Sequence, residues 1–193
     1  HPVTRGFLCH RTSRFLEHPV FHRHRIEHMG NWLSTPERIQ RMVRSGIIAI
    51  PNISFGYYVG DAILDCLGER RMTKSFPFKT LLKHGVILAG GSDSPGYWPV
   101  DPLRDISACV SRRMRWGEVL VPEERISVTE AFAMHTTTAA FAGFEEKIKG
   151  TLEVGKLADI AVLPEDPFEV PGERIKEIKG EMTIVGGEVK YEA

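Results

Sequence analysis

Asp93 and His28 are the two residues of this chain whose types and positions point most directly to chemistry. Asp93 follows an apolar run at residues 86–89 and two glycines, an order that predicts a buried strand ending in a turn. His28 ends a second candidate strand at residues 21–28. An imidazole and a carboxylate brought together at strand ends suit zinc or a similar divalent ion.

Each residue also has an ordinary structural interpretation. Asp93 is able to bind a metal, accept a proton or cap the next turn, because Asp is a common turn residue. His28 is either a ligand or a satisfied histidine of the core or surface. Two-residue alternation places His22 and His24 on the face of His28, deeper along the strand, and Glu27 on the opposite face. We therefore interpret Glu27 as structural.

The elements around these residues alternate between strands and helices. Thr35 and Pro36 predict a helix start, Gly46 predicts its end, and residues 47–50 form the next buried strand. A helix around residues 77–83 then leads to the strand before Asp93. The order strand, helix, strand, helix, strand predicts parallel strands with crossover helices. In such folds the catalytic groups lie at the carboxyl ends of the strands.

Residues 52–74 form a long stretch without a clear period, and it contains Gly56, Gly60 and Gly68. Such a loop in a compact domain is usually a functional lid or a poorly ordered insert. We expect a loop there, with a short helix at residues 62–67 at most.

The second half of the chain carries two clear helix starts. Asp101 and Pro102 predict a helix that runs to about Arg115. Ser127 and Glu130 have the spacing of a capping box, which opens an apolar helix through residues 131–141. His135 lies in that helix and is expected to be structural.

The periodicity changes after Gly143 to that of a small antiparallel β-unit. Strands are predicted at residues 159–163 and 174–178, followed by a hairpin that turns at Gly186-Gly187. The charge changes at the same point, from a net +5 over residues 1–143 to −5 over residues 144–193. These observations predict an α/β domain at 1–143 and a β tail at 144–193.

Composition restricts the class of protein. The chain has 193 residues, of which 42% are hydrophobic and 26% charged, as in globular proteins. It has no run of 18 apolar residues and no concentrated basic surface, so neither a membrane nor a nucleic acid is an expected partner. Cys9, Cys66 and Cys109 are odd in number and far apart, which fits a reducing cytoplasm.

Three motifs, in order, resemble the amidohydrolase superfamily, in its family 3 or YtcJ-like branch. The first two are Arg23-His24-Arg25-Ile26-Glu27-His28 and Gly91-Ser92-Asp93-Ser94-Pro95. The third is the tail from Gly150 to Leu163, with its Gly-Lys-Leu-Ala-Asp sequence, followed by Asp166-Pro167 and Val185-Gly186-Gly187. The resemblance covers nearly all of residues 22–191.

This resemblance implies a metal-dependent hydrolase on a (β/α)8 TIM barrel with an appended β-sandwich. His28 matches the ligand at the end of strand six, and Asp93 matches the strand-eight ligand that is also the general base. A divalent metal, one or two ions and zinc by preference, would activate water for attack on an amide or other C–N bond of a small molecule. Ser92 and Ser94 are interpreted as supports for Asp93, and the resemblance names no substrate-binding residue.

A whole barrel of ~250 residues does not fit in this chain. We therefore expect only strands six to eight and part of the sandwich, completed by a missing amino-terminal segment or by a homo-oligomer. The family's other ligands, a His-x-His, a bridging Lys or acid and a further His, are not among the recognised motifs. The alternative is a non-catalytic half-barrel scaffold or subunit.

Overall fold

The first sheet is parallel, and it brings together the segments that end at His28 and Asp93. The computed structural model describes residues 22–31, 34–93 and 98–193. Strands β1 (Arg25–Glu27) and β2 (Ile48–Ile50) pair in parallel, with Ile26 opposite Ala49. Parallel bridges join Ala49 to Leu88 and Asn52 to Gly91 on the other side of β2. The predicted parallel order is confirmed, although β1 is shorter than predicted and residues 86–91 make isolated bridges.

The crossover helices follow the predicted start and stop signals. Helix α3 (Pro36–Ser45) begins after Thr35, whose side chain accepts from Arg38 N, and ends at Gly46 with a φ of 58°. Its inward face buries Ile39 and Met42. Helix α6 (Phe78–Lys83) precedes the segment that leads to Asp93, and His84 caps its carboxyl end.

The prediction of a loop over residues 52–74 is wrong. Helices α4 (Ile53–Leu67) and α5 (Glu69–Met72) occupy most of it, with a kink in α4 at Val59. Of the glycines that argued against a helix, Gly60 is required by packing, whereas Gly56 leaves room for an ordinary contact. A Cβ at Gly60 would lie 2.5 Å from Met114 Sδ, and one at Gly56 would lie 3.5 Å from the Phe76 ring. Tertiary packing thus outweighs their low helix propensity.

Three further helices and a short 3-10 turn complete the α/β part. Helix α7 (Pro102–Ser111) starts at the predicted Asp101 cap, but it ends before Arg115 because Arg112 takes a left-handed backbone, with a φ of 60°. The 3-10 helix η1 (Pro122–Glu124) follows. The predicted capping box is present, and the apolar helix after it divides at Thr136 into α8 (Val128–His135) and α9 (Thr137–Ala142).

The tail contains an antiparallel sheet in the order β3 (Ile160–Val162), β4 (Met182–Val185) and β5 (Glu188–Glu192). The predicted hairpin turn is confirmed, since Gly186 and Gly187 have positive φ angles of 60° and 84°. The strand predicted at 174–178 is instead the 3-10 helix η2 (Gly172–Glu177). Ser107 Oγ of α7 donates to Gly172 O at 2.7 Å, and Ile175 is buried.

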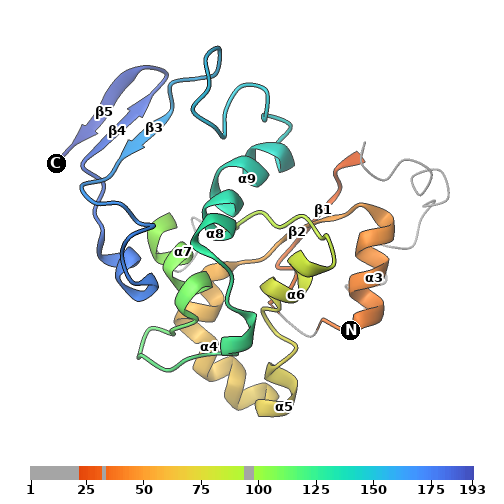
Figure 1. Ribbon diagram of the computed structural model, residues 1–193. Coiled ribbons are helices and arrows are strands. Elements are labelled where there is room, and N and C mark those ends of the chain that lie inside the picture. Colours follow the sequence, from red (N-terminus) through yellow and green to blue (C-terminus); the bar gives the residue numbers. More distant parts are fainter. Residues whose placement is uncertain (1–21, 32–33, 94–97) are drawn as a thin grey trace.

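Figure 1 shows the parallel strands and α3 at one end of the molecule and the β3–β5 sheet at the opposite end. Between them lies an apolar core whose largest buried side chains include Phe76, Phe78, Ile106, Met134 and Ile175. Among residues 22–31, 34–93 and 98–193, none of the helices is both long and apolar enough to cross a bilayer. The division at residue 143 stays a prediction.

Candidate active site

His28 and Asp93 meet at the carboxyl edge of the parallel sheet. His28 directly follows β1, and Asp93 lies two residues beyond the Gly91 bridge. His28 Nε2 is 3.7 Å from Asp93 Oδ1, and the two side chains are 40% and 43% exposed. Both residues have left-handed backbones, with φ angles of 57° and 59°. Such angles are uncommon outside glycine, although His, Asp and Asn tolerate them best.

A buried asparagine ties the two strand ends together. Asn31 Nδ2 donates to Asn52 O at 3.1 Å, and Asn31 Oδ1 accepts from Asn52 N at 3.0 Å. Asn31 N also donates to His28 O, which closes the turn after β1. Asn31 therefore holds the turn that carries His28 against the end of β2. Sequence reasoning missed this residue, because an Asn in a turn gives no signal of its distant partner.

The two glycines before Asp93 serve close packing. A Cβ at Gly91 would lie 3.0 Å from Ile50 Cγ2, and one at Gly90 would lie 2.8 Å from His135 Cε1. Gly90 N donates to Met134 O at 2.8 Å, which attaches the end of α8 to this segment. Neither glycine has a positive φ. They are needed for space, whereas the turn itself lies at Asp93.

His135 packs against the Gly90 backbone as a neutral imidazole. Its Nε2 is buried and has no hydrogen-bond partner among the described residues. Burial lowers the pKa of His135 to about 4, because the charged ring would lose its hydration. This environment agrees with the expected structural role.

A series of aromatic rings starts at His28 and leads away from the pair. The Phe55 ring is edge-to-face with His28 at 5.5 Å between centroids, and edge-to-face with Trp98 at 5.7 Å. Trp98 in turn stacks on Tyr58 at 4.8 Å. Phe55 and Tyr58 come from α4, the helix that directly follows β2. Sequence reasoning missed these rings because it treated α4 as a loop.

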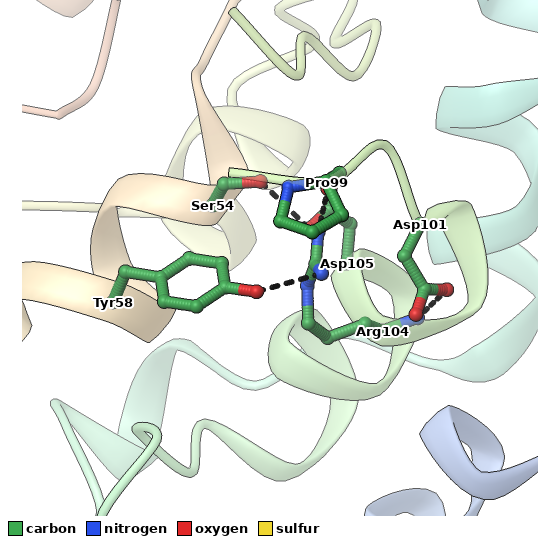
Figure 2. Close-up of polar contacts among 6 residues, drawn as sticks. All are labelled: Ser54, Tyr58, Pro99, Asp101, Arg104 and Asp105. Atoms are coloured by element: carbon green, nitrogen blue, oxygen red, sulfur yellow. Dashed lines mark hydrogen bonds and ion pairs between the residues drawn. The ribbon is translucent and has the colours of Figure 1, made fainter. Parts of the chain in front are cut away.

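The far end of this series is anchored by a buried arginine (Figure 2). Arg104 Nη1 donates to the Tyr58 hydroxyl at 2.8 Å, and Nη2 donates to Pro99 O at 2.7 Å. The guanidinium also lies 3.6 Å from Asp105, which accepts a hydrogen bond from Ser54 Oγ. Burial raises the pKa of Asp105 to about 6, although the Arg104 charge opposes this shift.

The remaining candidates lie away from the pair or outside the described residues. Glu27 is exposed, with Arg25 Nε 3.8 Å from its carboxylate, as a structural role predicts. His22 and His24 stack on each other before β1 begins, and His22 Nε2 lies 2.7 Å from Ser45 O. The predicted alternation therefore does not extend to them. Ser94 and Cys9 lie outside the described residues, as does Phe21, the predicted start of the first strand.

The geometry of His28 and Asp93 fits two ligands of one ion. Two donors at about 2.0–2.2 Å from a tetrahedral zinc ion are roughly 3.3–3.6 Å apart. The observed 3.7 Å separation is close to this spacing. Within the part of the chain that the structure describes, no group of three His, Cys, Asp or Glu side chains is placed to hold an ion. The pair therefore fits part of a metal site.

Comparison with known proteins places this arrangement in a family. The model of the "Amidohydrolase family" matches residues 7–191. The chain is 35% identical over 133 residues to the putative amidohydrolase YtcJ of Bacillus subtilis, covering 67% of this chain and 25% of that protein. It is 30% identical over 171 residues to the N-substituted formamide deformylase of Arthrobacter pascens, covering 87% of this chain and 31% of the relative.

A solved structure is similar to this chain in both fold and sequence. An uncharacterized metal-dependent hydrolase from Pyrococcus furiosus superposes with a TM-score of 0.62 and 30% identity, covering 75% of this chain and 29% of that one. The fold is thus a TIM-barrel-related α/β fold, and this chain spans about a quarter to a third of the relatives that it matches. The chain belongs to the amidohydrolase family, as the three sequence motifs predicted.

Proposed function

We propose that this chain forms the carboxyl-terminal part of a metal-dependent hydrolase that cleaves an amide or other C–N bond of a small molecule. His28 and Asp93 are the proposed ligands, and zinc is the ion that best suits an imidazole and a carboxylate. One observation carries the proposal: the two side chains converge to 3.7 Å at the carboxyl edge of a parallel sheet. Catalytic groups of barrel enzymes are found at this edge.

The proposed architecture is strands six to eight of a (β/α)8 barrel followed by part of a β-sandwich. The parallel order of β1, β2 and residues 86–91 supports the first part. The antiparallel β3–β5 sheet supports the second. Within the described residues β1 pairs with β2 alone, so its other edge is unpaired. Because a free strand edge readily pairs, we propose that a further barrel segment or a second copy covers it.

The residues at the site suggest how the reaction proceeds. A bound divalent ion supplies Lewis acidity and makes water a better nucleophile at neutral pH. Asp93 accepts the proton of the attacking water and delivers it to the departing amine, as a general base and then a general acid. His28 would hold the same ion from the end of β1, on the other side of β2 from the Asp93 segment. The partial exposure of both side chains leaves the pair accessible to a small-molecule substrate.

A second candidate function rests on the incomplete ligand set. Among the described residues, no third His, Cys, Asp or Glu joins His28 and Asp93 in a metal-binding group. A chain with two ligands alone would act as a scaffold or subunit. Such a chain would fold equally well with or without a chelator, and its stability would not depend on the identity of residues 28 and 93.

Hydrolysis of a panel of N-substituted formamides and related amides tests the proposal. Zinc-supplemented protein is expected to release amine, and Asp93→Asn is expected to lower kcat by about 10²–10⁴-fold, the usual contribution of a general base. Asp65→Asn is the matched control, because this carboxylate is exposed on α4. Equal rates for the two variants would exclude Asp93 as the base.

A further inference from the structure

The contact between Phe55 and His28 has no part in the hydrolytic step. Phe55 is partly buried in the first turn of α4, and its ring edge meets the His28 imidazole at 5.5 Å with an interplanar angle of 82°. Trp98 also meets this ring, at 5.7 Å between centroids and 88°. The two rings come from segments that follow β2 and Asp93. The chain thus places the Phe55 ring directly beside the proposed ligand His28, with Trp98 next to Phe55.

The second ring is held rigidly. Trp98 and Tyr58 are nearly parallel, with an interplanar angle of 7°, and the Tyr58 hydroxyl accepts from Arg104. Arg104 also bonds Pro99 O, the carbonyl of the residue after Trp98 (Figure 2). Arg104 is 6% exposed and pairs with the buried Asp105. A ring fixed on two sides loses little conformational entropy when a ligand packs against it.

The cations near this aromatic series lie over its tyrosines, away from His28. The guanidinium of Arg104 lies 4.9 Å from the Tyr58 ring centroid, and that of Arg115 lies 5.7 Å from it. Lys176 Nζ lies 5.7 Å from the Tyr57 ring. These tyrosine rings therefore already meet cations, whereas Phe55 meets the rings of His28 and Trp98. Phe55 and Trp98 thus offer apolar ring surface, which favours an uncharged substituent.

We propose that Phe55 is a specificity-determining residue that, together with Trp98, binds an uncharged aryl or bulky apolar substituent of the substrate beside His28 and Asp93. This inference rests on the proposed function for the position of the scissile bond. An aryl group gains most, because edge-to-face contacts between rings add to the area that is buried. Small aliphatic amides would bind weakly at the same site.

The test compares two neutral ligands, N-benzylacetamide and N-methylacetamide, by NMR titration of the 193-residue chain. The benzyl compound is expected to bind at least about tenfold more tightly, given the area of one buried ring. Phe55→Leu should reduce this preference about three- to tenfold. Phe168→Leu is the control, since it removes a ring that stacks on Phe132 in a different aromatic pair. Equal affinities for the two ligands, or an unchanged preference in folded Phe55→Leu, would overturn the inference.

A measurement on the unmodified protein covers the case in which Phe55→Leu does not fold. Nuclear Overhauser effects between the benzyl protons and the Phe55 ring are expected in the complex. A bound benzyl ligand without them would contradict the inference. The metal content of the same sample separates the two proposals. Benzyl preference without metal contradicts the hydrolase alone, whereas metal binding with equal affinities contradicts the aromatic site alone.

Discussion

His28 Nε2 lies 3.7 Å from Asp93 Oδ1, although the two residues are separated by two crossover connections. Both adopt left-handed backbones just beyond strand segments that flank β2 on its two sides. A non-glycine residue in this conformation costs of order 1 kcal/mol and persists where the surroundings fix it. Asn31 supplies one such constraint through its two hydrogen bonds to Asn52.

Gly90 is expected to be intolerant of a side chain. In Gly90→Ala the new Cβ would lie 2.8 Å from His135 Cε1, so the imidazole or the strand segment must move. Overpacking of this kind costs about 1–3 kcal/mol. The free energy of unfolding in urea measures it. Gly180→Ala is the matched control, because no atom lies within 4 Å of its Cβ position. A cost no larger than that of Gly180→Ala would contradict the packing described for His135.

Asp105 and His135 are expected to produce opposite pH dependences. The pKa of Asp105 is raised to about 6, so the folded state binds more protons than the unfolded state, and stability falls as pH rises from about 4 to 6. The pKa of His135 is lowered to about 4, so stability rises over about pH 4 to 6.5. Each effect is about 3 kcal/mol at most. The two largely cancel in the unmodified protein.

Variants that lack one of the two groups should show each pH dependence of stability separately. In Asp105→Asn, stability is expected to rise with pH between 4 and 6, because His135 titrates alone. In His135→Gln, stability is expected to fall over the same range. Urea unfolding at several pH values measures both. Parallel curves for the two variants would contradict the burial assigned to these groups.

Tyr58→Phe should remove one hydrogen bond of Arg104 and keep the stacking of this ring on Trp98. The change removes the hydroxyl that accepts from Arg104 Nη1, which leaves a buried charged donor without that partner. A loss of about 1–3 kcal/mol in the free energy of unfolding is expected. Tyr57→Phe is the control, because its hydroxyl makes no hydrogen bond among the described residues. The prediction fails if the two variants unfold at the same urea concentration.

The ion pair between Arg23 and Glu146 joins the start of β1 to the segment after α9. The guanidinium bonds both carboxylate oxygens at 2.7–2.8 Å and the Phe141 carbonyl at 2.8 Å. The Arg23 hydrogen bond lowers the pKa of Glu146 to about 2. The pair therefore stabilises the fold above the ordinary carboxyl pKa, and this contribution is lost as the pH falls toward 2.

Glu146→Gln is thus expected to be less stable than the unmodified protein at pH 7, with the difference shrinking as the pH is lowered. Thermal unfolding between pH 3 and 7 measures it. The exposed Glu181→Gln is the control and should track the unmodified protein. A difference for Glu146→Gln that is independent of pH would contradict the assignment.

The sequence alone was enough to predict features that depend on residues close together in the chain or on the order of the strands. Thr35, Asp101 and the Ser127–Glu130 box were identified because a cap depends on residues three positions apart. The meeting of His28 and Asp93 followed from the parallel order, since carboxyl ends of parallel strands share an edge. Their separation and backbone conformations did not follow, because these depend on contacts with other segments.

The features that the sequence missed depend on distant partners. Helix α4 was missed because its glycines fit against Met114 and Phe76, which are close only in the folded chain. The Phe55–Trp98 contact joins residues 43 positions apart and leaves no periodic signal. The 3-10 helix η2 was mistaken for a strand because its apolar residue Ile175 is buried toward α7 and not in a sheet.

Metal content per chain tests the central claim most directly. Elemental analysis of the purified 193-residue protein, prepared without added metal, is expected to find one or two zinc-like ions. His28→Ala and Asp93→Asn are expected to lose them, whereas His84→Ala and Asp65→Asn, at the end of α6 and on the surface of α4, should retain them. Folded protein without metal would show that this chain alone does not bind the ion, and equal, measurable metal content in all four variants would contradict a metal site at His28 and Asp93.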